Sequence, residues 1–230
     1  MIEDKKVLAI IPARGGSKGL PHKNILPVNN KPLIAWTITE AQKSKYIDSL
    51  ILTSEDAKII NIAQKWGCEV PFVRPEQLAT DETTGMAVVL HAIENTSAEY
   101  ELIVLLQPTS PLREVQDIDA CIQACCSQNA PACVTVTETE KPPFWMFYLQ
   151  NDRTMTPVLP DKECLKRRQD LPATYVLNGA VYVGQRQFIL QNKNFIHNDT
   201  IAHIMPKERS LDIDTKFDFK LFEAIGLAKK

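Results

Sequence analysis

The sequence has no long hydrophobic run. None of its apolar stretches approaches the roughly 18 residues of a membrane-spanning helix, and its first residues contain no signal-peptide hydrophobic region. We therefore predict a cytoplasmic protein that does not cross a membrane. Neither positive nor negative charge dominates the sequence, because 26 basic and 28 acidic residues leave a net charge of −2. This balance argues against a surface for nucleic acid or for an anionic membrane.

The six cysteines form no C-x-x-C pair and have no neighbouring histidine. This spacing favours neither a zinc site nor a disulfide framework, so we interpret the cysteines as small core residues in a reducing compartment. They are Cys68, Cys121, Cys125, Cys126, Cys133 and Cys164. The chain also has no internal repeat, and its 230 residues are expected to form one main domain with a small appendage.

Two common nucleotide-binding patterns are missing from residues 11–24. No register of this segment fits the Walker A motif, and glycines at positions 15, 16 and 19 do not fit the dinucleotide fingerprint G-x-G-x-x-G. The segment is still suited to phosphate, because an apolar strand over 7–11 leads into a glycine-rich turn that carries Arg14, Lys18 and Lys23. We predict a phosphate-binding loop of another design. The alternative is a tight turn whose cations are only solvated.

Apolar runs of strand length alternate with segments of helical period along most of the chain. This order is typical of a parallel sheet with crossover helices, so the predicted class is α/β, with a mainly parallel Rossmann-like sheet and helices on both faces. Strands are expected over 7–11, 49–53, 69–73, 102–106 and 132–137, and helices over 32–43, 57–66, 84–95, 117–127 and 216–228. The α/β character resumes at 180–183, 188–190 and 202–205.

The pattern changes after Thr137. Residues 141–160 contain four prolines, two aromatic clusters and an Asn-Asp turn, which together predict an extended hairpin outside the sheet. We expect residues 1–138 and 176–230 to form the α/β domain and residues 139–175 to form a protruding subdomain. Many apolar groups on such a ribbon would face water, so a second subunit is expected to cover them in a homodimer. The alternative is a ribbon that folds back onto its own sheet.

A polar loop follows the apolar strand over 102–106. Its sequence, QPTSPLR, offers Gln107, Thr109, Ser110 and Arg113 as hydrogen-bonding groups for a polyhydroxy or charged substrate. The carboxyl ends of strands are where open α/β sheets bind ligands. The alternative is that Thr109 and Ser110 only cap the next helix.

A second polar segment, RPEQLATD, follows the strand expected over 69–73. Its backbone is suited to the edge of a nucleobase, and Arg74 could stack on the base or donate a hydrogen bond to it. The simpler interpretation is that Thr80 or Asp81 begins a helix.

Two aspartates lie two residues apart in the segment SLDIDT. In an extended chain Asp212 and Asp214 project from the same side, and Mg²⁺ prefers one or two carboxylates together with water and phosphate oxygens. The pair therefore suggests a divalent cation beside a triphosphate. Alternatively, Asp214 caps the final helix and Asp212 faces water.

Five motifs in order, IPARGGSKGLPHKN, RPEQLATD, LLQPTSPLR, RRQDLP followed by NGAVYV, and SLDIDT, resemble one known family. They are similar to the cytidylyltransferases that activate sialic acid and related nonulosonic acids, and the resemblance covers about residues 7–222. It implies a nucleotidyltransferase sheet and a reaction of CTP with a nine-carbon 2-keto acid sugar, favouring N-acetylneuraminate, to give the CMP-sugar and pyrophosphate. It also implies a role in cell-surface glycan biosynthesis.

The resemblance assigns site residues by position. The nucleotide site would consist of Ala13, Arg14, Gly15, Ser17, Lys18, Lys23, Asn24, Arg74, Leu78 and Ala79. The sugar site would consist of Gln107, Thr109, Ser110, Arg168, Gln169, Asn178 and Tyr182. Arg14 and Lys23, with Asp212 and Asp214 holding Mg²⁺ or Mn²⁺, are expected to matter most for catalysis.

Three questions stay open at the level of the sequence. The sugar could instead be legionaminic acid, another diacetamido nonulosonate, or 3-deoxy-manno-octulosonate. Arg168 could act within its own subunit or across a dimer. Since a fold alone does not establish chemistry, the chain could also be a catalytically silent sensor of a nucleotide or sugar.

Overall fold

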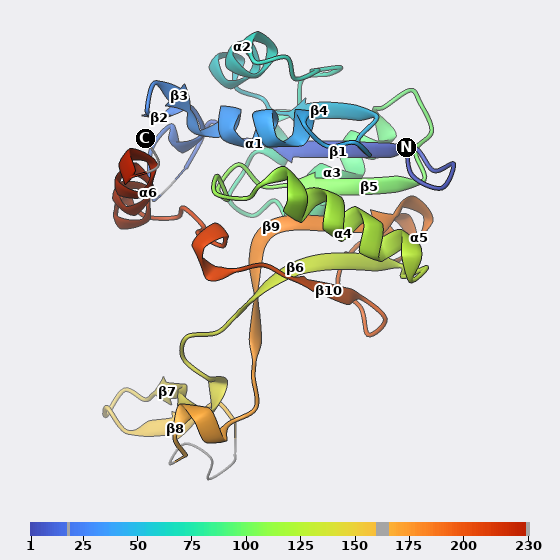
Figure 1. Ribbon diagram of the computed structural model, residues 1–230. Helices are drawn as coiled ribbons and strands as arrows, with labels where there is room; N and C mark the ends of the chain where they lie inside the picture. The colour runs from blue at the N-terminus through green and yellow to red at the C-terminus, as the bar shows by residue number, and fades with distance from the viewer. Residues whose placement is uncertain (18, 160–165, 229–230) are drawn as a thin grey trace.

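The computed structural model describes residues 1–17, 19–159 and 166–228, and it confirms the predicted α/β class. A mainly parallel sheet forms the body of the molecule, and a narrow arm, described over residues 139–159 and 166–174, extends from one end of it (Figure 1). No helix among the described residues is long and apolar enough to cross a membrane.

The central sheet has the strand order β10-β6-β9-β5-β1-β4. Its strands are β1 (Val7–Pro12), β4 (Ser49–Thr53), β5 (Leu102–Leu106), β6 (Ala132–Glu138), β9 (Tyr175–Gln185) and β10 (Ile201–Ile204). β1 is parallel to β4 and β5, and β10 is parallel to β6. β9 lies between β5 and β6 and is antiparallel to both, so one reversed strand divides two parallel groups.

Helices cover both faces of this sheet. One face packs against α1 (Leu33–Gln42), α2 (Ala57–Lys65) and α4 (Val115–Ser127), and the other packs against α3 (Gly85–Glu94) and α5 (Arg186–Asn192). The side chains of β1 alternate accordingly, since Val7 and Ala9 join the first core and Leu8 and Ile10 join the second. Both faces of β1, β4 and β5 are therefore buried, which explains their continuous apolar runs.

A third core anchors the C-terminal helix, α6 (Lys216–Ala228), beside the small hairpin β2 (Pro27–Val28) and β3 (Lys31–Pro32). Phe222 of α6 meets the ring of Trp36 edge to face, with ring centroids 5.2 Å apart. Ile213 belongs to the same core, so the SLDIDT segment enters α6 through a buried apolar anchor. This packing fixes the position of the two neighbouring aspartates.

Polar caps define where the helices begin. Asp56 accepts hydrogen bonds from the backbone N–H groups of Lys58 and Ile59 at the start of α2, and Thr84 accepts one from Ala87 at the start of α3. At α4, Glu114 and Asp117 form a reciprocal capping box. Thr109 and Ser110 therefore do not cap this helix.

The strand predicted over 69–73 is wrong. Glu69 makes a single parallel bridge to Ile51, and the chain then leaves the sheet. Pro71 and Pro75 lack the N–H group that a longer ladder needs, and the short 3₁₀ helix η2 (Glu76–Leu78) follows. The loop that begins at Arg74 still starts beside the end of β4, because the Arg74 N–H donates to the Ser54 carbonyl at 2.9 Å.

The arm contains the predicted hairpin, made of β7 (Phe147–Leu149) and β8 (Met155–Pro157). It stands away from the sheet and does not fold back onto it (Figure 1). β6 and β9 continue into its base, where Glu138 pairs with Tyr175. Exposed apolar side chains of the arm and its base include Trp145, Met146, Phe147, Tyr148, Leu149, Met155, Val158, Tyr175, Val176 and Leu177.

The described cysteines fit the expected role in the core. Cys68, Cys121, Cys125, Cys126 and Cys133 are buried free thiols, and Cys164 lies outside the described residues. Burial raises the pKa of Cys68 and of Cys125 to about 12, so these thiols stay protonated at neutral pH. They offer no reactive thiolate.

Candidate nucleotide and sugar site

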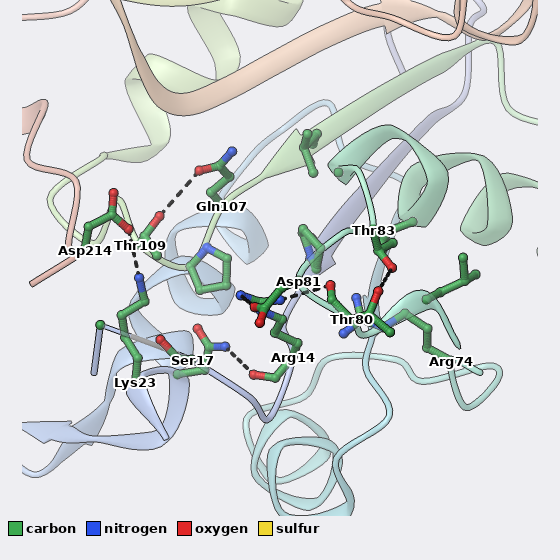
Figure 2. A pocket seen from close by; sticks show the side chains of 18 residues that line it. Arg14, Ser17, Lys23, Arg74, Thr80, Asp81, Thr83, Gln107, Thr109 and Asp214 are labelled. Atoms are coloured by element: carbon green, nitrogen blue, oxygen red, sulfur yellow. Dashed lines mark hydrogen bonds and ion pairs between the residues drawn. The ribbon is translucent and has the colours of Figure 1, made fainter. Parts of the chain in front are cut away.

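A cavity of about 410 Å³ lies at the carboxyl ends of β1 and β5 (Figure 2). Four segments that are far apart in the sequence border it: residues 12–24, residues 74–88, the loop after β5, and the SLDIDT segment. Its lining residues are Pro12, Arg14, Ser17, Gly19, Lys23, Asn24, Arg74, Leu78, Thr80, Asp81, Thr83, Gly85, Val88, Leu105, Gln107, Pro108, Thr109 and Asp214. The structure thus brings most of the predicted nucleotide residues together with two predicted sugar residues.

Residues 13–24, which we call the phosphate loop, are held by their own backbone and by neighbouring carboxylates. The Asn24 amide donates to the Arg14 carbonyl at 3.0 Å, and the Gly15 N–H donates to Glu55 at 2.7 Å. Asn24 is buried, so in this arrangement it fixes the loop. Lys18 lies outside the described residues.

Arg14 spans the mouth of the cavity. Its guanidinium donates to the Thr80 carbonyl at 3.1 Å and forms an ion pair with Asp81 at 2.9 Å, which Figure 2 shows between the two walls. Both side chains are partly exposed, so this ion pair contributes little to stability. An incoming phosphate could take over the guanidinium of Arg14 from Asp81.

Arg74 is buried and already neutralised. Its side chain is 3% exposed, and Nη2 lies 2.5 Å from a carboxylate oxygen of Glu55. Arg74 lines the cavity, and its buried Nε–H has no hydrogen-bond partner among the described residues. A neutralised arginine with one spare N–H suits an uncharged acceptor, such as a base carbonyl, better than a phosphate.

The short helix η2 places the rest of the predicted base pocket. Leu78 lines the cavity, and Ala79 ends the turn with its N–H bonded to the Glu76 carbonyl. Thr83 also lines the cavity, but its hydroxyl is 2.8 Å from that of Thr80 and 3.1 Å from the Gln77 carbonyl. The Thr83 hydroxyl therefore stabilises the loop.

Lys23 connects the phosphate loop to the aspartate pair. Its ammonium donates to the Ile213 carbonyl at 2.5 Å and to Asp214 at 3.1 Å. The lysine is buried and Asp214 is exposed, so the charge of Lys23 is directed toward the cavity edge where Asp214 lies (Figure 2). Asp214 does not cap α6, because Thr215 does: its hydroxyl accepts the Asp218 N–H at 3.3 Å, and Asp218 accepts the Thr215 N–H at 2.7 Å.

Asp212 lies deeper than Asp214 and close to it. Burial raises its pKa from the ordinary value, and the negative charge of Asp214 acts in the same direction. Its Oδ1 is buried without a hydrogen-bond partner among the described residues. A carboxylate with one unsatisfied buried oxygen, lying beside a second carboxylate, fits a hard divalent cation, which would neutralise both negative charges. The described residues contain no group of three or more histidine, cysteine or acidic side chains that could hold a metal.

Gln107 and Thr109 form the wall opposite the base pocket. The Thr109 hydroxyl donates to the Gln107 side-chain oxygen at 3.4 Å, and the Thr109 carbonyl accepts the Ile213 N–H at 2.9 Å. A Cβ on Gly179 would lie 3.0 Å from the same Gln107 oxygen. Gln107 is therefore positioned between the phosphate side and β9.

Arg113 and Ser110 do not belong to this wall. Arg113 is 1% exposed and donates to the Gln107 and Ala180 carbonyls and to the Thr37 hydroxyl, at 3.2, 2.7 and 2.7 Å. Burial lowers the Arg113 pKa to about 10, yet the side chain stays charged at neutral pH. Ser110 is fully buried and lines no part of the cavity. Neither can meet a substrate, which corrects the expected contact through Ser110.

Two predicted sugar residues on β9 differ in availability. Asn178 is buried, and its amide is engaged with Thr135, Ser210 and the Met205 sulfur, so it joins β9 to β6 and to the segment before the aspartates. The expected contact of Asn178 with sugar does not fit this arrangement. Tyr182 is half-buried, and burial together with the Asp212 charge raises its pKa.

Arg168 and Gln169 lie in the arm and line a separate cavity of about 440 Å³. Arg168 pairs with Glu138 at 3.3 Å and donates to the Thr139 carbonyl at 3.1 Å. Figure 1 shows the arm apart from the end of the sheet where the first cavity opens. One chain therefore does not bring these two residues to Gln107.

Comparison with known proteins identifies the family of the chain. The model of the family described as "Cytidylyltransferase" matches residues 8–224. The chain belongs to the cytidylyltransferase family. An N-acylneuraminate cytidylyltransferase of Escherichia coli is 36% identical over 98% of the chain, which spans 52% of that protein. A pseudaminic acid cytidylyltransferase of Campylobacter jejuni is 34% identical over 94% of each protein. The chain thus spans about half the length of the first relative and nearly all of the second.

Solved structures show the same fold for this cytidylyltransferase. A CMP:2-keto-3-deoxy-manno-octonic acid synthetase complexed with CTP superposes with a TM-score of 0.76 at 14% identity, over 98% of this chain and all of that one. A 4-diphosphocytidyl-2C-methyl-D-erythritol synthase of Anaerococcus prevotii gives a TM-score of 0.69 at 15% identity, over 96% and 98% of the two chains.

Sequence reasoning missed two acidic partners in this cytidylyltransferase. Glu55 holds Gly15 and Arg74, and Asp81 holds Arg14. Glu55 follows β4 at the carboxyl edge of the sheet, and this position was the signal that could have found it.

Proposed function

We propose that the protein transfers CMP from CTP to a nonulosonic acid, with an N-acylneuraminate as the preferred sugar. The anomeric hydroxyl oxygen forms a bond to the α-phosphorus, the bond between the α-phosphorus and the bridging oxygen breaks, and pyrophosphate leaves. The hydroxyl proton is released to solvent. The observation that supports this most is the meeting of the phosphate loop, the base-side loop, Gln107 and the aspartate segment in one cavity.

Charge explains how such a site would work. An anionic sugar must approach an anionic triphosphate, so the groups that matter neutralise and orient phosphate. Arg14, Ser17 and Lys23 border the cavity as donors for the phosphates. Lys18 is proposed with them from its place in the motif. Arg74, with the backbone of Leu78 and Ala79, would read the pyrimidine.

Asp212 and Asp214 would hold Mg²⁺, with Mn²⁺ as a substitute. A bound divalent cation would supply Lewis-acid polarisation of the α-phosphate and charge for the leaving pyrophosphate. The unsatisfied oxygen of Asp212 and the exposed carboxylate of Asp214 support this role. Lys23 orients the pair by holding Ile213 and Asp214.

The sugar would occupy the side of Gln107, Thr109 and Tyr182. The relatives include proteins named for N-acylneuraminate, for pseudaminic acid and for N,N'-diacetyllegionaminic acid, all nine-carbon acids. A diacetamido nonulosonate is therefore the second candidate substrate. A further alternative, 3-deoxy-manno-octulosonate, has support only from a structural neighbour at 14% identity.

We further propose that two copies form a homodimer through their arms. The exposed apolar side chains of the arm support this, and so does the distance of Arg168 and Gln169 from the cavity of their own chain. Such a dimer would let Arg168 of one copy meet the sugar carboxylate in the other. The domain division at residues 139–175 and a reducing, cytoplasmic location complete the proposal. The free buried thiols fit this location.

The decisive experiment measures pyrophosphate release with Mg²⁺ and three acids in parallel: N-acetylneuraminate, a diacetamido nonulosonate and 3-deoxy-manno-octulosonate. We expect release with CTP and a nine-carbon acid, and none with ATP or UTP. Binding of CTP without turnover of any acid would favour a silent sensor. Asp214→Ala separates the two cases, because an enzyme should lose turnover, whereas a sensor should keep binding.

A further inference from the structure

Glu55 contacts both halves of the nucleotide site with a single carboxylate. One of its oxygens accepts the Gly15 N–H of the phosphate loop at 2.7 Å, and the other meets Arg74 Nη2 of the base-side loop at 2.5 Å. The glutamate side chain is 15% exposed and that of Arg74 is 3% exposed. Hydrogen bonds of this charge-assisted kind are stronger than neutral ones, and the low exposure limits screening by solvent.

The surrounding backbone leaves this contact little freedom. A Cβ on Gly15 would lie 2.5 Å from an oxygen of Asp56, so the loop packs directly on the residues that follow β4. The Arg74 N–H donates to the Ser54 carbonyl at 2.9 Å, and Arg74 Nη2 is 3.4 Å from the Ala13 carbonyl. Both partners of Glu55 are therefore set by the same end of the sheet.

The contact also decides which donors remain for a ligand. The Gly15 N–H and one nitrogen of Arg74 are occupied by Glu55, while Arg74 Nε has no partner among the described residues. Loss of Glu55 would leave the buried positive charge of Arg74 without its carboxylate partner and would release the Gly15 N–H of the phosphate loop. The geometry of the base side and that of the phosphate side thus depend on one carboxylate.

We propose that Glu55 is a positioning residue that couples the nucleobase and phosphate halves of the site. Through Gly15 it fixes the phosphate loop, and through Arg74 it fixes the base-side loop, before CTP binds. A preorganised site loses less conformational entropy on binding, so this coupling strengthens the binding of the whole nucleotide. The inference rests on the proposed function, because it takes CTP as the ligand.

The test compares Glu55→Gln with the wild type and with Glu69→Gln. Glu69 is exposed and lies outside the cavity, so its replacement removes the same charge without touching the site. Binding of CTP, CMP and pyrophosphate is measured by calorimetry with Mg²⁺, and thermal unfolding confirms that each variant is folded. Steady-state kinetics then separate KM for CTP from kcat.

We expect Glu55→Gln to weaken CTP binding by about 10- to 100-fold, the range for a lost hydrogen bond to a charged group. CMP and pyrophosphate should each bind more weakly too, and KM for CTP should rise while kcat at saturating CTP changes by less than about threefold. Glu69→Gln should match the wild type. The CTP affinity of Glu55→Asp, whose shorter side chain cannot reach both partners, should lie between that of the wild type and that of Glu55→Gln. This variant replaces Glu55→Gln in the test if Glu55→Gln does not fold.

Three outcomes would overturn the inference. CTP affinity within twofold of the wild type would leave Glu55 a purely structural role. Tighter CTP binding would show that Glu55 competes with phosphate instead of positioning the loop. Weaker pyrophosphate binding with unchanged CMP binding would show that the two halves are not coupled. If the wild type itself fails to bind CTP, the proposed function fails, and this result is distinguishable from the other three.

Discussion

The carbonyl oxygen of Asp214 occupies the place where a side chain on Gly19 would begin, because a Cβ there would lie 2.3 Å from it. The phosphate loop and the aspartate segment therefore touch through backbone atoms. Lys23 holds the same two segments together from the other side, through Ile213 and Asp214. The relative position of phosphate donors and carboxylates depends on this contact.

Gly19→Ala should push the two segments apart. Backbone atoms give way less easily than a flexible side chain, so we expect the free energy of unfolding to fall by about 1–3 kcal/mol and CTP turnover to fall with it. Urea denaturation and pyrophosphate release measure the two effects. Gly16→Ala is the stability control, since a Cβ at Gly16 would meet no atom within 4 Å. Equal stability of the two variants would contradict the prediction.

Arg113→Ala should be among the most destabilising substitutions in the chain. It removes one hydrogen bond within the loop after β5 and two that join this loop to β9 and α1, and it leaves a cavity at a position that is 1% exposed. We expect a loss of about 3–5 kcal/mol, read from urea denaturation. Arg153→Ala, in the exposed part of the arm, should change stability by less than about 0.5 kcal/mol.

Asp212→Asn should stabilise the folded protein at neutral pH while it lowers turnover. Burial raises the folded-state pKa of Asp212, so the folded state holds its proton more tightly than the unfolded state does. Wild-type stability therefore falls as pH rises from the ordinary carboxyl pKa through the raised value. We expect Asp212→Asn to have a higher melting temperature at pH 7 without metal, with the difference shrinking toward pH 4. A constant difference between pH 4 and pH 7 would contradict the assignment.

The buried thiols should resist alkylation in the folded state. With Cys164 replaced by serine, the five described cysteines should react with iodoacetamide only slowly at pH 8, because Cys68 and Cys125 have pKa values near 12 and all five are buried. Unfolding in urea should expose all five. Mass spectrometry counts the modified thiols, and rapid native modification would contradict the described burial.

Charges on the arm should disrupt the proposed dimer. Leu149 and Met155 pair across the hairpin and are 70% and 64% exposed, so Leu149→Asp with Met155→Asp places two carboxylates on its apolar face. Light scattering should give twice the 25.9 kDa chain mass for the wild type and 25.9 kDa for the variant. Ile204→Asp, on the outer strand β10, should remain dimeric. A monomeric wild type at micromolar concentration would refute the proposal.

Much of the fold could be predicted because local patterns and tertiary packing agree. The strands over 49–53 and 102–106 and the helix over 216–228 have the predicted bounds. The segment 69–73 was misjudged because its apolar residues look like a strand, whereas proline limits it to one bridge. The length and reversed direction of β9 could not be predicted, since strand direction depends on pairing partners that an apolar run does not specify.

The candidate site divides in a similar way. Motif positions predicted Arg14, Lys23 and Gln107 as site residues, and all three line one cavity, because they follow strands whose carboxyl ends meet at one edge. The same reasoning could not distinguish Thr109, which faces the cavity, from Ser110, which is buried beside it. Which side chain faces inward depends on the turn geometry of a proline-rich loop, and residue type alone does not encode it.

The ladder between β6 and β9 extends past the body of the molecule, with Thr137 opposite Val176 and Glu138 opposite Tyr175. The arm, which connects β6 to β9, is thus carried on extensions of two strands of the sheet. If β6 and β9 were cut at two paired residues, an arm of different length or sequence could be grafted onto them. The sheet would then fix the orientation of the grafted arm. Such an exchange would leave the backbone around Tyr182, further along β9, unchanged.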